Sequence, residues 1–129
     1  MSQTDFAFSG VYAAALTPQT DAGAPDIGLM ASHCRWLLDN GCDGLAILGT
    51  TGEANSFTVE ERIAILDGLK DAGIPGDALM PGTGACALPD AVTLTRAALK
   101  NGAKGVLMLP PFYYKSPSDD GLFAAYSEI

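Results

Sequence analysis

The stretch that decides the fold is Leu45-Ala46-Ile47-Leu48 followed directly by Gly49-Thr50-Thr51-Gly52-Glu53. The apolar run predicts a buried strand, and the polar residues after it predict a loop at the strand's C-terminal end. The two glycines allow backbone angles that other residues resist, and they let a ligand approach the main chain. Two threonine hydroxyls and the nearby N–H groups supply donors for a carboxylate or another small oxyanion. Taken alone, this composition fits an ordinary strand-to-helix turn equally well.

The segments on both sides of this stretch alternate between strand and helix patterns. Strands are predicted at residues 10–16, 43–48, 78–80 and 105–109. Helices are predicted between Asp26 and Asn40, between Thr58 and Gly73, between Pro89 and Asn101, and from Ser118 onward. Strands that alternate with helices imply a parallel sheet joined by right-handed crossovers.

A short internal sequence repeat supports this division of the chain. The sequence at 40–45 recurs in pattern at 101–106, and Gly44 and Gly105 are 61 residues apart. Two βα units of about 30 residues each account for this distance. The repeat therefore predicts four consecutive βα units.

Two architectures contain such units: an open doubly wound sheet and a (β/α)8 barrel. A Gly-x-Gly-x-x-Gly pattern after the first strand would favour a dinucleotide-binding sheet, and it is absent. The polar and glycine-rich segments instead follow the strands, at 17–18, 49–53, 82–85 and 110–114. This placement favours the active face of a barrel, although open α/β sheets also bind ligands at that edge.

Composition narrows the function. The chain has 129 residues and a net charge of −8, which suits one domain without an internal boundary and argues against nucleic-acid binding. Its three cysteines, Cys34, Cys42 and Cys86, are widely spaced, and His33 is the sole histidine, so we expect no metal site and no cofactor. Free cysteines and the lack of a membrane-length apolar run predict a cytoplasmic protein with no membrane partner.

Four pieces of the sequence resemble one known family. They are Ala14 to Pro18, Gly49 to Glu53, Pro81 to Gly84 and Pro110 to Tyr114, in the family's order and near its spacing. The chain resembles the pyruvate-dependent class I aldolases of the dihydrodipicolinate synthase and N-acetylneuraminate lyase group. The resemblance implies a (β/α)8 barrel of which residues 1–129 form the N-terminal half, about the first four βα units.

The resemblance also implies roles for particular side chains. Family members form a Schiff base between a lysine and a 2-keto acid, usually pyruvate. Thr51 inherits binding of the keto-acid carboxylate, and Thr50 inherits a place beside it in a hydroxyl relay. Tyr113 completes the relay across a dimer interface, with Tyr114 as the alternate. Hydroxyl groups can pass the protons that imine formation requires.

Neighbouring residues are expected to support this site. Thr17 ends the first strand and borders the pocket, while Gly49 and Gly52 shape the loop. Glu53 is expected to be a buried carboxylate that pins its own loop.

The nucleophilic lysine of the family lies on a later strand. Lys70 and Lys100 are at predicted helix C-termini, Lys104 is at a strand's start, and Lys115 is in a polar loop. None has the desolvated position at a strand end that lowers a lysine pKa. We therefore expect this chain alone to be inactive, with an uncovered inner face and open sheet edges.

Several functions stay open at this point. The first is the N-terminal part of a carbon–carbon lyase or synthase that acts on pyruvate and an aldehyde, and forms dimers or tetramers. The second is a non-catalytic half-barrel that serves as a binding or assembly module. Within the family, Thr50-Thr51 favours a dihydrodipicolinate synthase over an N-acetylneuraminate lyase or a keto-deoxy sugar acid aldolase.

Overall fold

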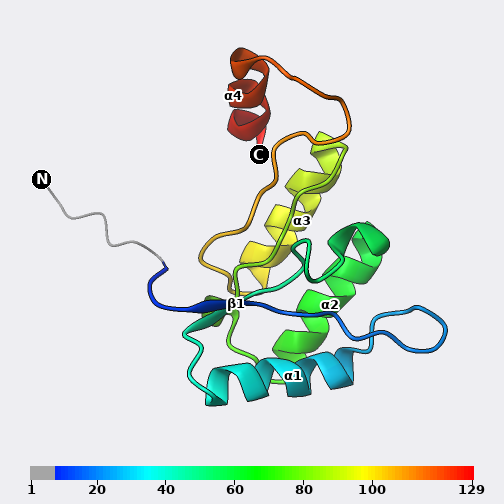
Figure 1. Ribbon diagram of the computed structural model, residues 1–129, viewed down its shortest axis with the longest axis vertical. Coiled ribbons are helices and arrows are strands. Elements are labelled where there is room, and N and C mark those ends of the chain that lie inside the picture. The colour runs from blue at the N-terminus through cyan, green and yellow to red at the C-terminus, as the bar shows by residue number, and fades with distance from the viewer. Residues whose placement is uncertain (1–7) are drawn as a thin grey trace, which may run out of the picture.

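The computed structural model describes residues 8–129 and follows the predicted alternation (Figure 1). In chain order, its elements are β1 (Tyr12–Ala14), α1 (Ile27–Asp39), β2 (Gly44–Ala46), the 3-10 turn η1 (Ala54–Ser56), α2 (Val59–Asp71), the 3-10 turn η2 (Gly76–Ala78), α3 (Leu88–Lys100) and α4 (Asp119–Glu128). Within residues 8–129, no helix is long and apolar enough to cross a membrane.

The helices begin where local capping signals place them. The Asp26 carboxylate accepts a hydrogen bond from the Leu29 N–H at 2.9 Å and starts α1. Thr58 and Glu61 form the predicted capping box at the start of α2, with bonds of 3.1 and 2.9 Å. Each of these side chains satisfies a backbone donor that has no partner inside its helix.

Three helices end at glycines in the left-handed region. Gly41, Gly73 and Gly102 follow α1, α2 and α3, with φ angles of 99°, 81° and 94°. A side chain is strained at such angles, so glycine is the residue suited to this position. The predicted stop signals are confirmed.

The strands are shorter than predicted. β1 and β2 pair in parallel, with Tyr12 opposite Gly44 and Ala14 opposite Ala46. The segments expected as third and fourth strands form single parallel bridges, Leu45 with Leu79 and Gly82 with Leu107. The prediction of full strands at 78–80 and 105–109 is wrong in extent. Ala78 belongs to η2, and the residues around 81–84 are rich in proline and glycine.

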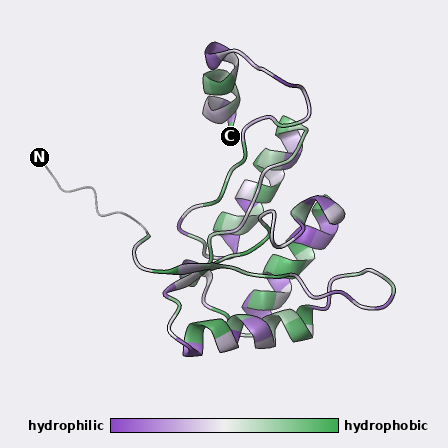
Figure 2. Ribbon diagram, viewed as in Figure 1, coloured by the Kyte–Doolittle hydropathy of each residue, from purple (hydrophilic) through white to green (hydrophobic). Residues whose placement is uncertain are grey.

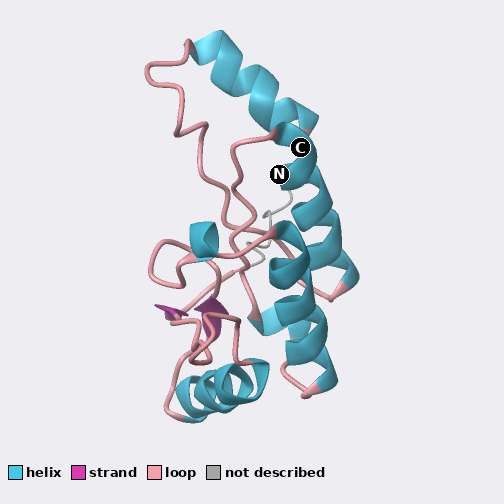
Figure 3. Ribbon diagram, turned by 90° about the vertical axis from the view of Figure 1, so that its right-hand side faces the viewer, coloured by secondary structure: helices cyan, strands magenta, loops and turns pink. Residues whose placement is uncertain are grey.

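The helices and the extended segments form two layers. Figure 3 shows α2 and α3 on one side and the extended segments on the other. Apolar and polar residues alternate along the helices (Figure 2). The core side chains with no exposed surface come from α1, β2 and its continuation, α2 and α3: they are Met30, Cys34, Leu45, Ile47, Ile65, Leu69 and Ala98.

Several large apolar side chains of the extended layer lack cover. Leu16, Leu107 and Leu109 are 56%, 40% and 44% exposed. They follow β1 or belong to the segment that bridges Gly82. An uncovered apolar surface in this layer agrees with the expectation for part of a barrel.

Burial makes Cys34 unreactive. Desolvation raises the pKa of its thiol to about 11, so roughly one thiol in a thousand is ionised at pH 8. We predict that iodoacetamide at pH 8 modifies the exposed Cys86 in the folded chain and modifies Cys34 only after unfolding, because the thiolate is the reactive species. Peptide mass mapping with and without guanidinium chloride checks this, and equal labelling of both cysteines in the folded chain would contradict it.

Candidate functional site

The loop after β2 begins with a reversal of the main chain at a leucine. Leu48 is buried and has a φ of 54°, and Glu53 at the other end of the loop has a φ of 52°. Such angles cost a residue with a Cβ atom on the order of 1–3 kcal/mol. Neither Gly49 nor Gly52 has a positive φ, so the expectation that the glycines supply the unusual angles is wrong.

Gly52 is instead required by close packing. A Cβ atom there would lie 2.9 Å from the Leu48 nitrogen and 3.0 Å from the Ala15 carbonyl oxygen. The Thr17 hydroxyl, which is buried, donates a hydrogen bond of 2.7 Å to the Gly52 carbonyl. The end of the first strand therefore holds the loop through Thr17, as a supporting residue would.

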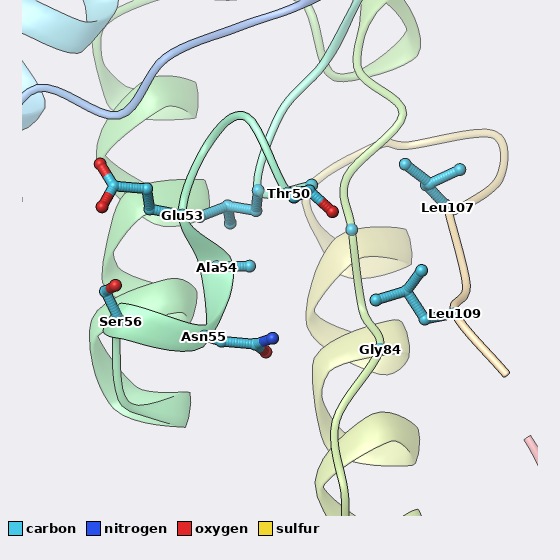
Figure 4. A pocket seen from close by; sticks show the side chains of 11 residues that line it. Thr50, Glu53, Ala54, Asn55, Ser56, Gly84, Leu107 and Leu109 are labelled. Carbon is cyan, nitrogen blue, oxygen red and sulfur yellow. The ribbon is translucent and has the colours of Figure 1, made fainter. Parts of the chain in front are cut away.

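A cavity of about 270 Å³ lies between this loop and the next two extended segments. Gly49, Thr50, η1, Gly82, Gly84, Leu107 and Leu109 contribute to its lining. In Figure 4 the Thr50 hydroxyl and the Asn55 amide point towards the two leucines, across the glycines. The cavity therefore has polar groups on one side and apolar groups on the other, a combination common in small-molecule sites.

The cavity receives only some of the predicted site residues. Thr50, Gly49 and Glu53 line it, whereas Thr51, Gly52 and Thr17 do not. Glu53 is exposed, and its carboxylate points away from the cavity (Figure 4). The expectation of a buried carboxylate is wrong because the left-handed backbone of Glu53 turns the side chain outward.

The two tyrosines lie outside the cavity. Tyr113 and Tyr114 are 70% and 82% exposed. Their rings contact each other edge to face, with centroids 5.2 Å apart and an interplanar angle of 89°. The Lys115 ammonium donates to the Phe112 carbonyl at 2.7 Å and closes this turn. The roles of both tyrosines stay predictions.

Sequence reasoning missed Arg62. This side chain is buried on α2, and its guanidinium donates to the Gly82 carbonyl at 2.8 Å and to the Gly84 carbonyl at 3.1 Å. Burial lowers its pKa, and the Asp90 carboxylate partly opposes that shift. Position 62 lies on the same helix face as the buried Ile65, Leu66 and Leu69, and this 3-4-7 spacing is the signal that could have identified it.

The lysines contact other groups. Lys70 donates to the Lys100 carbonyl at 3.5 Å, and Lys104 pairs with Asp77 at 3.6 Å on the exposed surface. Over the part of the chain that the structure describes, no group of three His, Cys, Asp or Glu residues is placed to hold a metal ion.

Parallel strands, covering helices and a cavity where the strands end define an α/β protein, a class in which ligands commonly bind at this edge. The chain matches the dihydrodipicolinate synthetase family over residues 7–129, and it belongs to that family.

Similar proteins agree with this assignment. The 4-hydroxy-tetrahydrodipicolinate synthase of Synechococcus sp. WH7803 is 37% identical over 95% of this chain and 40% of its own length. The dihydrodipicolinate synthase structure from Agrobacterium tumefaciens superposes with a TM-score of 0.88 at 42% identity, covering 92% of this chain and 42% of that one. The E. coli K12 prophage protein YagE, of the same family and in complex with pyruvate, gives a TM-score of 0.84 at 29% identity, covering 94% and 40%.

The chain thus spans about 40% of the length of the relatives that it matches. The described residues are a small α/β fold with two parallel strands that superposes on part of these barrel enzymes.

The Leu48 main chain passes so close to Gly82 that a Cβ atom there would overlap the Leu48 carbonyl group. We predict that Gly82→Ala lowers the free energy of unfolding by about 2–3 kcal/mol, because backbone on both sides must move. Gly28→Ala is the control: in α1 the new Cβ meets only a carboxylate oxygen at 3.6 Å, and the change should stabilise by up to about 1 kcal/mol. Urea unfolding measures both, and equal effects would contradict the packing argument.

Proposed function

We propose that the chain is the N-terminal half, about four βα units, of a Schiff-base-forming lyase or synthase that acts on pyruvate or a related 2-keto acid. The observation that carries the proposal is the Thr50 hydroxyl in the cavity at the strand ends, within the loop that characterises the family. The relative in complex with pyruvate supports a keto-acid substrate. The Thr50-Thr51 pair favours a dihydrodipicolinate synthase-like reaction over cleavage of neuraminate or keto-deoxy sugar acids.

In this proposal the loop binds the keto acid and the rest of the protein supplies the amine. The hydroxyl and N–H groups of Thr51, with Thr50, hold the carboxylate and orient the C2 carbonyl. A lysine outside residues 1–129 adds to C2 to give a carbinolamine. The Thr50 hydroxyl and a tyrosine hydroxyl then pass a proton to the departing hydroxyl, which leaves as water. An aldehyde is the second substrate, and no cofactor is needed.

The tyrosine is Tyr113, with Tyr114 as the alternate, supplied by a second copy in a dimer or tetramer. Both rings are exposed and clear of the cavity of their own chain, which is the placement that donation to another copy requires. We place the protein in the cytoplasm, where its cysteines stay reduced.

A second candidate is a non-catalytic binding or assembly module. The placement of Lys70, Lys104 and Lys115 away from the lining of the cavity beside Thr50 favours it for the isolated chain. Covalent trapping separates the candidates, because only the first requires a reactive amine.

The test joins residues 1–129 to the remaining part of the Agrobacterium tumefaciens synthase. We expect pyruvate with borohydride to add a covalent 1-carboxyethyl group to this chimera, through reduction of the imine, and mass mapping to place it on a lysine beyond residue 129. The isolated chain should stay unmodified. An adduct on Lys115 or on any other lysine of the chain would refute the claim that the reactive amine lies outside residues 1–129. An unmodified, folded chimera would favour the binding module.

The role of Thr51 is tested in the same chimera. We predict that Thr51→Val raises the pyruvate concentration for half-maximal trapping about tenfold or more, because a hydrogen bond to a charged group contributes about 1.5–3 kcal/mol. Thr51→Ser keeps the hydroxyl and should stay within about twofold of the parent. Equal behaviour of the two variants would remove Thr51 from the carboxylate site.

A further inference from the structure

A buried charge lies directly behind the cavity wall. Arg62 is 3% exposed, and both terminal nitrogens of its guanidinium donate to carbonyls of the wall at Gly82 and Gly84. Burial of a charged group is costly unless hydrogen bonds satisfy it. Packing alone therefore does not explain why a charged side chain is buried at this position.

The burial of Arg62 is explained by an interruption in the backbone hydrogen bonds between the β2 segment and the segment that contains Gly82. In a parallel pair, the bonds are evenly spaced along both strands. The Gly82 N–H donates to the Ile47 carbonyl at 2.8 Å, so the next bond would run from the Gly49 N–H to the Gly82 carbonyl. Leu48, with its φ of 54°, turns the chain away at this point, and within residues 8–129 the Gly49 N–H makes no such bond to the Gly82 carbonyl.

Arg62 replaces the missing donors. Carbonyls two residues apart point to the same edge of a strand, so Gly82 and Gly84 lose their ladder partners together. A guanidinium presents its N–H groups as a planar fork and can reach both carbonyls at once, whereas an ammonium is a single point charge. The Nε atom has no partner within residues 8–129, and the hydrogen bonds of the guanidinium go to these two carbonyls.

We propose that Arg62 is a positioning residue for the keto-acid pocket. It holds the Gly82–Gly84 wall in place at the point where the hydrogen bonds between the strands end and the loop begins. This inference rests on the proposed function for the identity of the ligand. Gly82 and Gly84 have no side chains, and Thr83 between them is buried, with its hydroxyl 3.0 Å from the Thr95 hydroxyl. The positions of the two glycines therefore depend on backbone contacts, and Arg62 supplies two of these contacts from behind.

The first experiment uses the 129-residue chain. Arg62→Met keeps most of the side-chain volume and removes the fork, and Arg62→Lys keeps the charge. Arg35→Met is the matched control, because the Arg35 guanidinium donates to the Ala72 carbonyl between α1 and the end of α2. Hydrogen exchange is measured by mass spectrometry under conditions where circular dichroism shows every variant folded.

We expect exchange in a peptide spanning 80–86, which contains the bonded amides of Gly82 and Thr83, to be about tenfold faster or more in Arg62→Met. Arg62→Lys should show a smaller change, and Arg35→Met should leave this peptide unaffected. An unchanged peptide in Arg62→Met, or an equal change in Arg35→Met, would overturn the proposal.

The second experiment measures pyruvate trapping in the chimera. Arg62→Met should raise the half-saturating pyruvate concentration about tenfold while the maximal rate stays within about twofold, because the wall orients the ligand and does not react. A lowered maximal rate with unchanged saturation would overturn the positioning role. If the parent chimera traps no pyruvate, the proposed function fails, while the exchange measurement still decides whether Arg62 holds the wall.

Discussion

The passage of the Leu48 main chain across Gly82 is the constraint on which the site depends. It ends the β2 ladder after Gly82 and directs the loop outward. It also leaves the cavity between Thr50 and Leu107. The reversal uses a left-handed leucine, a strained conformation that persists only where surrounding structure enforces it. Here the enforcement comes from the buried Leu48 side chain and from the close packing at Gly52.

Helices and strands contribute differently to this fold. The helices α1, α2 and α4 begin with side-chain caps, and α1 and α2 bury apolar side chains in the same core cluster as Leu45 of β2. The strands have short ladders, and Thr17 and Arg62 add side-chain bonds where backbone partners run out. At the point where strand pairing ends, backbone N–H and C=O groups lack strand partners. A site at this point therefore needs side chains from other elements to hold its walls.

Local signals in the sequence predicted the helices, because the Asp26 cap, the Thr58 capping box and the terminal glycines act within a few residues. The strand lengths could not be predicted in this way, because a ladder depends on what the neighbouring segment does. The loop was recognised, yet the left-handed angles fall on Leu48 and Glu53, which no local preference indicates. Arg62 was missed because a charge next to two glutamates is typical of an exposed helix face.

The helices α1, α2 and α3 each contain 13 residues, a length of roughly 20 Å. Each is followed within two residues by a glycine in the left-handed region. Equal helix length makes the βα units similar in size, so a duplicated unit could be added beside its parent without altering the spacing of the helices. The matching sequences at 40–45 and 101–106 are what descent by such tandem duplication would leave.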